Sequence, residues 1–432
     1  MAELLFALFV TVHSGQAAQP TAGERYVEAN EARRTILSAW QLITDTHYDA
    51  AVVNSDEWLR AREAALNRAL TTMTVQRLRD IISELLSVLN ASHFKLWPAE
   101  LAPRSLGSHS RGLDVRVADG QVVITHVHAE SEAANQGIRA GDVLVRIDAR
   151  PVRVAEKDQD RTVRQRVLTD LSREGTKPID VTLEDRRGAR RRVRMPREAE
   201  SGGSMTGALA SATPSVTQER VCRHHCASYL RFDLWLPDIM APVRSVIADA
   251  VRSQLRGIII DLRGNRGGFG PLAIQVAGYF FSETQVLGTM RSRHSPLQYV
   301  ANPQVFVDGA VTVGPYQGPV ALLIDEVTAS TSEVFAAAMQ EAGRARIFGQ
   351  RSAGVALPSY FSALPNGDML QHAVATFETR GGRKLEGQGV VPDGVVTRRR
   401  KYIVSECDAP LEAAMQWLET GSREVHEPCP IR

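Results

Sequence analysis

The sequence lacks any apolar run long enough to cross a membrane, which takes about 20 consecutive residues. It also lacks a large excess of charge of either sign. It has 51 lysines and arginines and 49 aspartates and glutamates, which gives a net charge of +2. This balance gives no global basis for binding nucleic acid. The 432 residues are 44% hydrophobic and 23% charged, as in globular proteins, and this length predicts roughly two or three domains.

Cysteine is scarce, with only Cys222, Cys226, Cys407 and Cys429. An even count favours disulfides in an exported protein. The sequence separations favour Cys222–Cys226 and Cys407–Cys429, although four cysteines allow three pairings. The alternative is a zinc site in which the first two cysteines act with the two histidines between them. That spacing is unusual and lacks a clear second ligand pair, so we predict no metal.

The amino terminus carries features of an export signal. Residues Leu4–Val12 are apolar, and the small residues of Ser14–Ala17 offer a site for a signal peptidase. The usual positive start is missing, and Glu3 stands there instead. We predict a signal peptide over residues 1–18, and therefore a periplasmic or secreted protein.

The rest of the chain changes character several times. Apolar residues recur at steps of three and four from Val75 to Leu89, which predicts one face of a helix. Short β runs follow, then a Ser- and Gly-rich stretch, and then strands that alternate with helices, which predicts an α/β domain. The predicted boundaries are 19–104 for a helical region, 105–200 for a mostly β domain, 201–217 for a linker, 218–402 for the α/β core and 403–432 for the tail.

Two distant segments of the core have the character of two halves of one hydrolytic site. In Gly257–Gly268 an apolar strand stops in a glycine-rich turn, and in Ala321–Glu333 another stops in a Ser/Thr cluster that opens a helix. A serine in the first turn of a helix gains from free N–H groups and the helix dipole. Ser332 is therefore the predicted nucleophile, with Ser330 and Thr331 as rival hydroxyls. The alternative is that all three only cap the helix.

A serine nucleophile also needs donors for the oxyanion that forms when it attacks. Glycine lets the backbone approach a reacting carbonyl closely, so the N–H of Gly267 or Gly268 is the first predicted donor. The N–H of Glu333 is the second. The alternative is a tight turn without a catalytic part. A glycine-rich turn after a strand can also bind phosphate. This indication is weak here, because the turn lacks the Gly-Lys-Ser/Thr ending of a P-loop.

These motifs, with Leu385–Asp393, resemble the carboxy-terminal processing (tail-specific) protease family. The telling parts are Asp261–Gly268 and Ala329–Glu333. The resemblance implies a ClpP/crotonase-like α/β core and protein or peptide substrates, cut near their carboxy termini. It also implies that the nucleophile is the serine directly before Glu333, namely Ser332, and that neither cofactor nor metal is needed.

One position departs from that pattern. Many members use a lysine base in a glycine-flanked turn, which is Gly349–Ala356 here, and Val355 stands where the lysine is expected. Valine cannot accept a proton, so a Ser–Lys dyad of that form is excluded. Among the later lysines, Lys384 is a possible relocated base, although nothing in its local sequence marks it as one.

A second branch of the family, resembling the tricorn core protease, uses a histidine base. That histidine follows a serine after the helical region, as Ser92 and His93 do here, and Glu386 matches a glutamate late in the core. The resemblance implies that His93 deprotonates Ser332, while Glu386 and Ser92 orient the imidazole. The alternative is a structural histidine at a helix end.

Residues 105–200 resemble a bacterial PDZ domain, inserted between the helical region and the core. The pattern of Ala133, Ala134, Gly137-Ile138, Gly141-Asp142 and Leu144 carries this resemblance. A PDZ domain binds an extended peptide at a sheet edge and captures its terminal carboxylate. The residues implied in that capture are Arg111, Gly112, Leu113, Asp114 and Val115. The alternative is a domain that only covers the active site.

We therefore predict an exported serine endopeptidase. Two alternatives stay open. The first is a catalytically inactive protein that binds protein tails through the PDZ domain, as the valine at position 355 suggests. The second is a hydrolase of a non-peptide acyl compound, because fold alone does not set the substrate.

Overall fold

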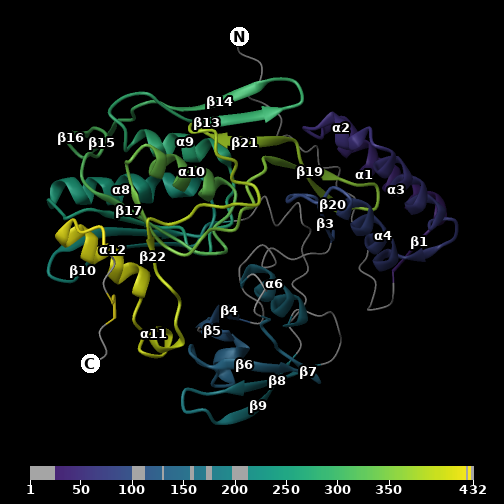
Figure 1. The fold of residues 1–432 in the computed structure, drawn as a ribbon, viewed down its shortest axis with the longest axis horizontal. Helices are drawn as coiled ribbons and strands as arrows, with labels where there is room; N and C mark the ends of the chain where they lie inside the picture. The colour runs from purple at the N-terminus through teal and green to yellow at the C-terminus, as the bar shows by residue number, and fades with distance from the viewer. Residues whose placement is uncertain are drawn as a thin grey trace.

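The computed structural model describes residues 25–99, 112–128, 131–155, 160–171, 178–196, 213–424 and 427–429. The predicted signal peptide and Arg111 lie outside these ranges. Figure 1 shows an α/β core, a small β-rich part and a group of amino-terminal helices, which meet near the centre of the view. None of the helices in the described ranges is long and apolar enough to cross a bilayer.

The core is built on a six-stranded sheet in the order β10-β11-β12-β17-β18-β22. Strands β11 to β22 run parallel, and β10 pairs antiparallel with β11. β12 lies within Gly257–Gly268 and β17 overlaps Ala321–Glu333, the two segments in which apolar strands were predicted. Their bounds are β10 (Val216–Cys222), β11 (Cys226–Phe232), β12 (Ile258–Asp261), β17 (Val320–Ile324), β18 (Arg346–Gly349) and β22 (Gly394–Val395).

Helices cover both faces of this sheet, which explains why its central strands are apolar throughout. Alternate residues of β12 point to opposite sides: Ile258 and Ile260 join the cluster with helices α8, α9 and α10, and Ile259 joins the cluster with α12. The helices are α8 (Met240–Arg252), α9 (Gly270–Gly278), α10 (Thr331–Glu341), α11 (Arg400–Val404) and α12 (Ala409–Thr420). Because β12 and β17 are parallel neighbours, the turns after them meet at one edge of the sheet.

The amino-terminal helices pack around their own apolar cluster, which includes Ile36, Trp58 and Ile82. They are α1 (Ala29–Thr46), α2 (Ala50–Val53), α3 (Asp56–Asn67) and α4 (Val75–Ser87), with the short strands β1 (Tyr26–Val27) and β2 (Met73–Thr74). Strand β3 (Lys95–Trp97) follows α4 and pairs with β20 (Met369–Ala373), which also pairs with β19 (Ser359–Ala363). This pairing joins the chain around His93 to the core.

The core carries two further antiparallel sheets in its described residues. Strand β13 (Gln285–Ser292) lies between β14 (Pro296–Ala301) and β21 (Ala375–Thr379). Strands β15 (Phe306–Asp308) and β16 (Val311–Val313) form a separate hairpin.

The small β-rich part, called the β unit here, has strands in the order β4-β5-β6-β8-β9 with helices α5 and α6. Its basic strand β9 lies at the edge of the sheet. That the unit is a PDZ domain stays a prediction. Its elements are β4 (Leu113–Ala118), β5 (Gln121–Val127), α5 (Glu132–Asn135), β6 (Val143–Ile147), β7 (Arg150–Pro151), α6 (Asp160–Leu171), β8 (Ile179–Glu184) and β9 (Arg190–Met195).

Both disulfides have the pairing that the sequence separations favour. Cys222–Cys226 closes the β10–β11 hairpin, and Cys407–Cys429 ties the tail to the turn before α12. With its two sulfurs bonded to each other, the 222–226 hairpin has no thiolate for the zinc site that was the alternative.

Candidate active site

Ser330 is the last residue before α10 and has an unusual backbone. Its φ of 56° and ψ of −122° are a conformation that residues with a side chain rarely adopt. Gly267 lies directly against it, since a Cβ on Gly267 would stand 2.6 Å from the Cβ of Ser330. The Ser330 N–H donates to Val355 O at 2.7 Å and contacts Glu333 Oε2 at 3.2 Å. Strained, half-buried serines of this kind are typical of functional sites.

Ser332, the predicted nucleophile, lies in the core instead. Its exposed fraction is 0%, and its hydroxyl accepts a hydrogen bond from Trp235 Nε1 at 2.8 Å. The Ser332 hydroxyl is buried and accepts the hydrogen bond of the buried Trp235 indole. A substrate could reach this hydroxyl only if both side chains moved. The geometry therefore favours Ser330, one of the two rival hydroxyls, over Ser332.

Two of the predicted oxyanion donors are already engaged. The N–H of Gly267 donates to Asn265 Oδ1 at 2.9 Å, and the N–H of Glu333 donates to Ser330 O at 2.8 Å. Gly268, the other predicted donor, is exposed, and its carbonyl accepts from Thr331 Oγ1 at 2.8 Å. Thr331 is the first residue of α10, so its N–H has no partner within the helix. The amides of Gly268 and Thr331 are therefore the better candidates.

The structure brings Ser92, His93 and Glu386 into one hydrogen-bonded chain. Glu386 accepts from the Ser92 N–H at 3.0 Å and from the Ser92 hydroxyl at 2.9 Å, and that hydroxyl lies 2.8 Å from His93 Nδ1. A hydroxyl has one proton, which goes to the carboxylate, so His93 Nδ1 must be the donor to Ser92 Oγ. The lone pair of the imidazole is then on Nε2.

A single dipeptide links this relay to Ser330. Val355 O accepts from the Ser330 N–H, and the next amide, Ala356 N–H, donates to Glu386 Oε2 at 2.9 Å. The nucleophile candidate and the imidazole relay are thus held on either side of residues 355 and 356. The chain at this position contributes its backbone, which valine supplies as well as lysine would.

Burial lowers the pKa of His93 to about 4, and the negative charge of Glu386 opposes this only in part. The imidazole is therefore neutral at neutral pH, as a general base must be. His93 also has a positive φ of 61°, in the turn that leads from α4 to β3. Lys384, the relocated base considered above, is exposed and pairs through its backbone with Glu378.

The side chain of Glu333 organises the loop opposite Ser330. Its buried carboxylate accepts from Ser352 Oγ at 2.5 Å, Gly354 N at 2.7 Å and Val355 N at 2.8 Å. Burial raises the pKa of Glu333, while these hydrogen bonds act against that rise. Glu333 thus holds the 352–355 turn with its side chain, a role that the sequence analysis did not foresee.

A second carboxylate connects three segments of the site. Asp325 Oδ1 accepts from Gly264 N at 2.9 Å and Val327 N at 3.0 Å, which fixes both turns at the sheet edge. Its other oxygen faces Arg116 of β4, with Nη2 at 3.2 Å. The guanidinium holds the pKa of Asp325 well below its ordinary value, although burial acts in the opposite direction. The sequence analysis missed this pair, because Arg116 comes from the β unit.

The residues predicted to capture a peptide carboxylate are held within the β unit. Leu113 and Val115 point into its apolar cluster. Asp114 pairs with Arg116 and, at 3.1 Å, with Arg164 of α6. Gly112 packs against Ser131, where a Cβ on the glycine would stand 2.1 Å from the serine Cβ. Arg111 lies outside the described residues.

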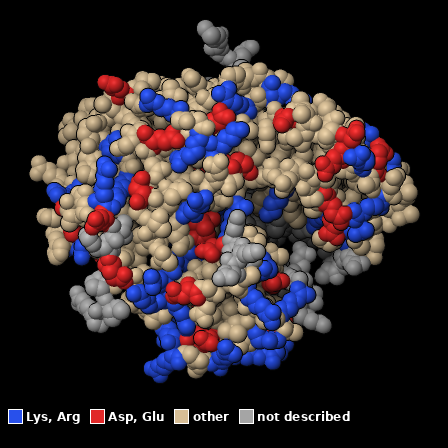
Figure 2. Space-filling view, in the orientation of Figure 1, with Lys and Arg blue, Asp and Glu red and all other residues tan. Residues whose placement is uncertain are grey.

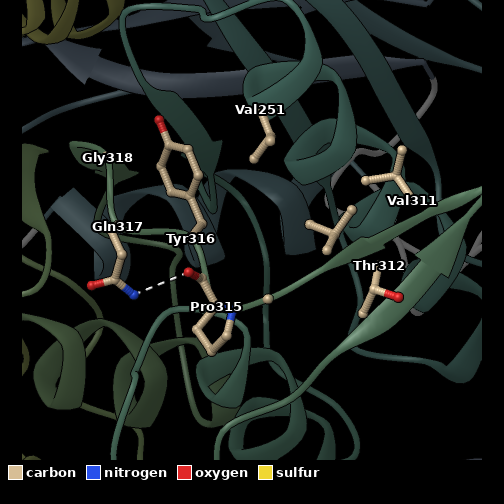
Figure 3. Close-up of a pocket in the computed structure, with 9 residues that line it drawn as sticks. Val251, Val311, Thr312, Pro315, Tyr316, Gln317 and Gly318 are labelled. Atoms are coloured by element: carbon tan, nitrogen blue, oxygen red, sulfur yellow. Dashed lines mark hydrogen bonds between the residues drawn. The ribbon is translucent and has the colours of Figure 1, made fainter.

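A cavity of about 360 Å³ lies elsewhere, next to the end of α8 and the strand β16. Figure 3 shows Tyr316, Gln317 and Val251 around it, with Gln317 Nε2 donating to Pro315 O at 3.0 Å. It contains none of the residues of the site described above.

The chain is similar to known peptidases. Residues 228–396 match the model of Peptidase family S41. The "Carboxyl-terminal-processing protease" of Synechocystis sp. is 24% identical over 408 residues, which cover 92% of this chain and 89% of that protein. The "C-terminal processing peptidase, chloroplastic" of Tetradesmus obliquus is 24% identical over 368 residues, covering 83% and 75%.

Solved structures share the fold. The photosystem II D1 C-terminal processing protease has a TM-score of 0.55 at 20% identity, covering 84% of this chain and 93% of that one. A mutant of CPAF, "cpaf s499a", has a TM-score of 0.66 at 13% identity, covering 92% and 99%. The chain is therefore a serine-type peptidase, a hydrolase. Its core thus resembles peptidase family S41, and the chain is similar to carboxyl-terminal processing proteases.

Proposed function

We propose that Ser330 is the nucleophile of this peptidase and His93 its general base. The observation that carries the proposal is the bridge at residues 355 and 356, which hydrogen-bonds to Ser330 on one side and to Glu386 on the other. Ser92 and Glu386 are positioning residues, because they act through the imidazole. The Gly268 and Thr331 amides are the proposed oxyanion donors.

The reaction follows from these roles. His93 Nε2 takes the Ser330 proton while Oγ attacks the carbonyl carbon of a peptide bond, and the oxyanion accepts from the two amides. The intermediate collapses, the C–N bond breaks, and His93 returns the proton to the leaving amine. A water molecule, deprotonated by His93, then hydrolyses the acyl-enzyme and restores Ser330. Throughout, Nδ1–H stays bonded to Ser92, so the tautomer is fixed.

The proposed substrates are protein chains cut near their carboxy termini, after export of the enzyme from the cytoplasm. The names of the similar proteases, which refer to carboxy-terminal processing, support this preference. The proposed PDZ domain at residues 105–200 would bind the tail of such a substrate at the free edge of β4.

Covalent labelling tests this proposal. We expect a fluorophosphonate probe, mapped by mass spectrometry, to modify Ser330 in the wild type, and the modification to be lost in His93→Ala. Lys384→Ala is the matched control and should label normally. A label on Ser332, or a loss of labelling with Lys384→Ala and not with His93→Ala, would reject the assignment.

The pH dependence provides an independent prediction. A base must be unprotonated, and the pKa of His93 is lowered to about 4 from its ordinary 6.5. We therefore expect kcat/KM to remain high as the pH falls through 6.5 and to decline only near 4. Initial rates of hydrolysis of one peptide, measured from pH 6.5 down to about 4, give the acid side of the plot of kcat/KM against pH. An acid limb at or above 6.5 in stably folded enzyme would contradict the role of His93.

A further inference from the structure

The turn between α4 and β3, which carries His93, has a strained backbone at two residues. Asn90 and His93 have φ values of 44° and 61°, in the left-handed region that residues with a side chain rarely adopt. Such conformations persist only where the surrounding structure holds them. Hydrogen bonds from Ser92 to Glu386 hold this turn on the side of the core. The residue after His93 provides a second support, on the side of the amino-terminal helices.

Phe94 supplies this second support through its ring. It follows His93 directly, and its ring stacks on that of His47, with centroids 5.4 Å apart and planes inclined by 17°. His47 is the residue at which α1 ends, is 2% exposed, and also stacks on Tyr48 at 4.4 Å. Its Nδ1 lies 3.0 Å from the backbone N and from the backbone O of Asp49, which fixes the orientation of the ring. The end of α1 therefore determines where the ring next to the base lies.

Arg293, in the turn between β13 and β14, fastens the end of α1 to the core. Its guanidinium donates to Thr44 O at 2.9 Å, to Asp45 O at 3.4 Å and to His47 O at 3.0 Å. The last carbonyls of a helix have no partner within it, and positive charge is favoured beside them. The last turn of α1 contains no basic residue, so Arg293 supplies this charge from the core. Figure 1 shows the β13–β14 hairpin extending toward the amino-terminal helices.

A buried histidine of β20 makes a further link from the core to α1. Thr46 Oγ1 donates to Leu42 O at 2.6 Å, and the same oxygen lies 3.0 Å from His372 Nδ1. Because the hydroxyl proton is already used, Nδ1 is the donor, and Nε2 accepts from Ser362 Oγ at 3.0 Å. Burial lowers the pKa of His372, which favours the neutral ring that this pattern requires. Figure 2 shows a hollow between the core and the amino-terminal helices, so links of this kind set how the two parts are placed.

We propose that Arg293, His47 and Phe94 are positioning residues for the general base, and we call these three residues the α1 clamp. This inference rests on the proposed function, because it takes His93 as the base of Ser330. The nucleophile belongs to the core, whereas the base follows α4, so the distance between them depends on how the amino-terminal helices are held against the core. The clamp fixes the base from the helical side. A displacement of about 1 Å in a catalytic group can cost about a hundredfold in rate.

Substitutions in the α1 clamp should lower kcat and leave KM nearly unchanged, because the clamp acts on the base rather than on substrate binding. We expect Arg293→Gln and His47→Ala each to lower kcat about tenfold to a hundredfold in folded enzyme. His47→Phe keeps a ring for Phe94 to stack on and should retain most of the activity, and Arg293→Lys should retain part of it. Arg291→Gln is the matched control, because it removes an exposed arginine of the same hairpin that donates to Glu378 at 3.0 Å, and it should leave kcat unchanged.

The titration of His93 gives a readout that a purely structural role would not move. Loosening the turn admits water to the imidazole, so its pKa should rise from about 4 toward 6.5. Glu386, whose negative charge raises the same pKa, is present in every variant. NMR titration of the histidine rings in the wild type, Arg293→Gln and Arg291→Gln measures the shift, with the signal of His93 assigned by its absence in His93→Ala. The acid side of the plot of kcat/KM against pH should move in the same direction.

These measurements separate failure of the α1 clamp from failure of the proposed function. An unchanged titration of His93 in both Arg293→Gln and His47→Ala would overturn the clamp, whatever happens to kcat. A shifted titration with kcat at the wild-type value would also overturn it, provided that His93→Ala is inactive. If the titration shifts as expected but His93→Ala hydrolyses peptides as fast as the wild type, the clamp does position the imidazole and the proposed function fails.

Discussion

Replacing Ser330 by alanine should abolish peptide hydrolysis, whereas replacing Ser332 by alanine should leave most of it. Loss of a serine nucleophile lowers kcat by about four orders of magnitude or more, because the base and the oxyanion donors then have nothing to activate. Ser332 is buried in the core at 0% exposure, so its hydroxyl makes no contact with a substrate that could be lost. Steady-state rates and fluorophosphonate labelling of both variants measure the difference.

We expect Ser332→Ala, the more active variant, to be the less stable of the two. Ser332→Ala removes the acceptor of the Trp235 indole N–H, and an unsatisfied buried donor costs about 1–3 kcal/mol. Ser330→Ala removes a hydroxyl from a half-buried site and should change the free energy of unfolding by less. Urea denaturation of each variant checks this. If Ser332→Ala is inactive while fully folded, and Ser330→Ala is active, the nucleophile is Ser332, as the sequence motif indicated.

The sequence could not separate these two serines, for a physical reason. They stand two positions apart in one Ser/Thr cluster, and both precede residues that favour a helix. What distinguishes them is the partner of each: Trp235, which is 97 residues away, binds Ser332. The strained φ of Ser330 depends on Gly267, from the other half of the site. Local propensity contains no information on either contact.

The central strands were easier to predict, because parallel strands that are buried on both faces must be continuously apolar. Apolar strands were predicted in Gly257–Gly268 and Ala321–Glu333, and β12 lies within the first segment while β17 overlaps the second. Their parallel pairing in the structure brings the two following turns to one edge of the sheet. The proposed oxyanion donors could not be predicted in the same way, because the hydrogen bonds that Gly267 and Glu333 already make are visible only in three dimensions.

The relay of Ser92 and Glu386 spans 294 residues, so no spacing rule could have linked its members. The resemblance to a family suggested it, and the hydrogen bonds among Ser92, His93 and Glu386 are compatible with it. Arg116 illustrates the opposite case. Neither pattern nor resemblance marked it, although it contacts Asp325 from another part of the chain. Its contribution should be large.

Arg116→Met should destabilise the junction of the core and the β unit and slow catalysis. The change removes the only guanidinium that Asp325 contacts in the described residues, and leaves its carboxylate buried at 4% exposure. Breaking a buried ion pair from one side costs about 3–5 kcal/mol. Because Asp325 also holds Gly264 N and Val327 N, kcat should fall even in molecules that remain folded. Urea denaturation and kcat of the folded fraction measure the two effects.

The sign of the pH effect distinguishes this mechanism from simple loss of packing. The pKa of Asp325 is depressed in the folded wild type, so its contribution to stability is present above its unfolded pKa and is lost only as the pH falls through the folded value. Without Arg116, the pKa of Asp325 is lowered less against the effect of burial, so the variant should lose stability at a higher pH than the wild type. Arg190→Met, which removes an exposed arginine paired with Glu184, is the matched control and should change stability by less than about 1 kcal/mol. If Arg116→Met behaves like this control at neutral and at acid pH, Asp325 does not depend on the β unit for its charge, and the coupling between the two parts of the chain must be sought elsewhere.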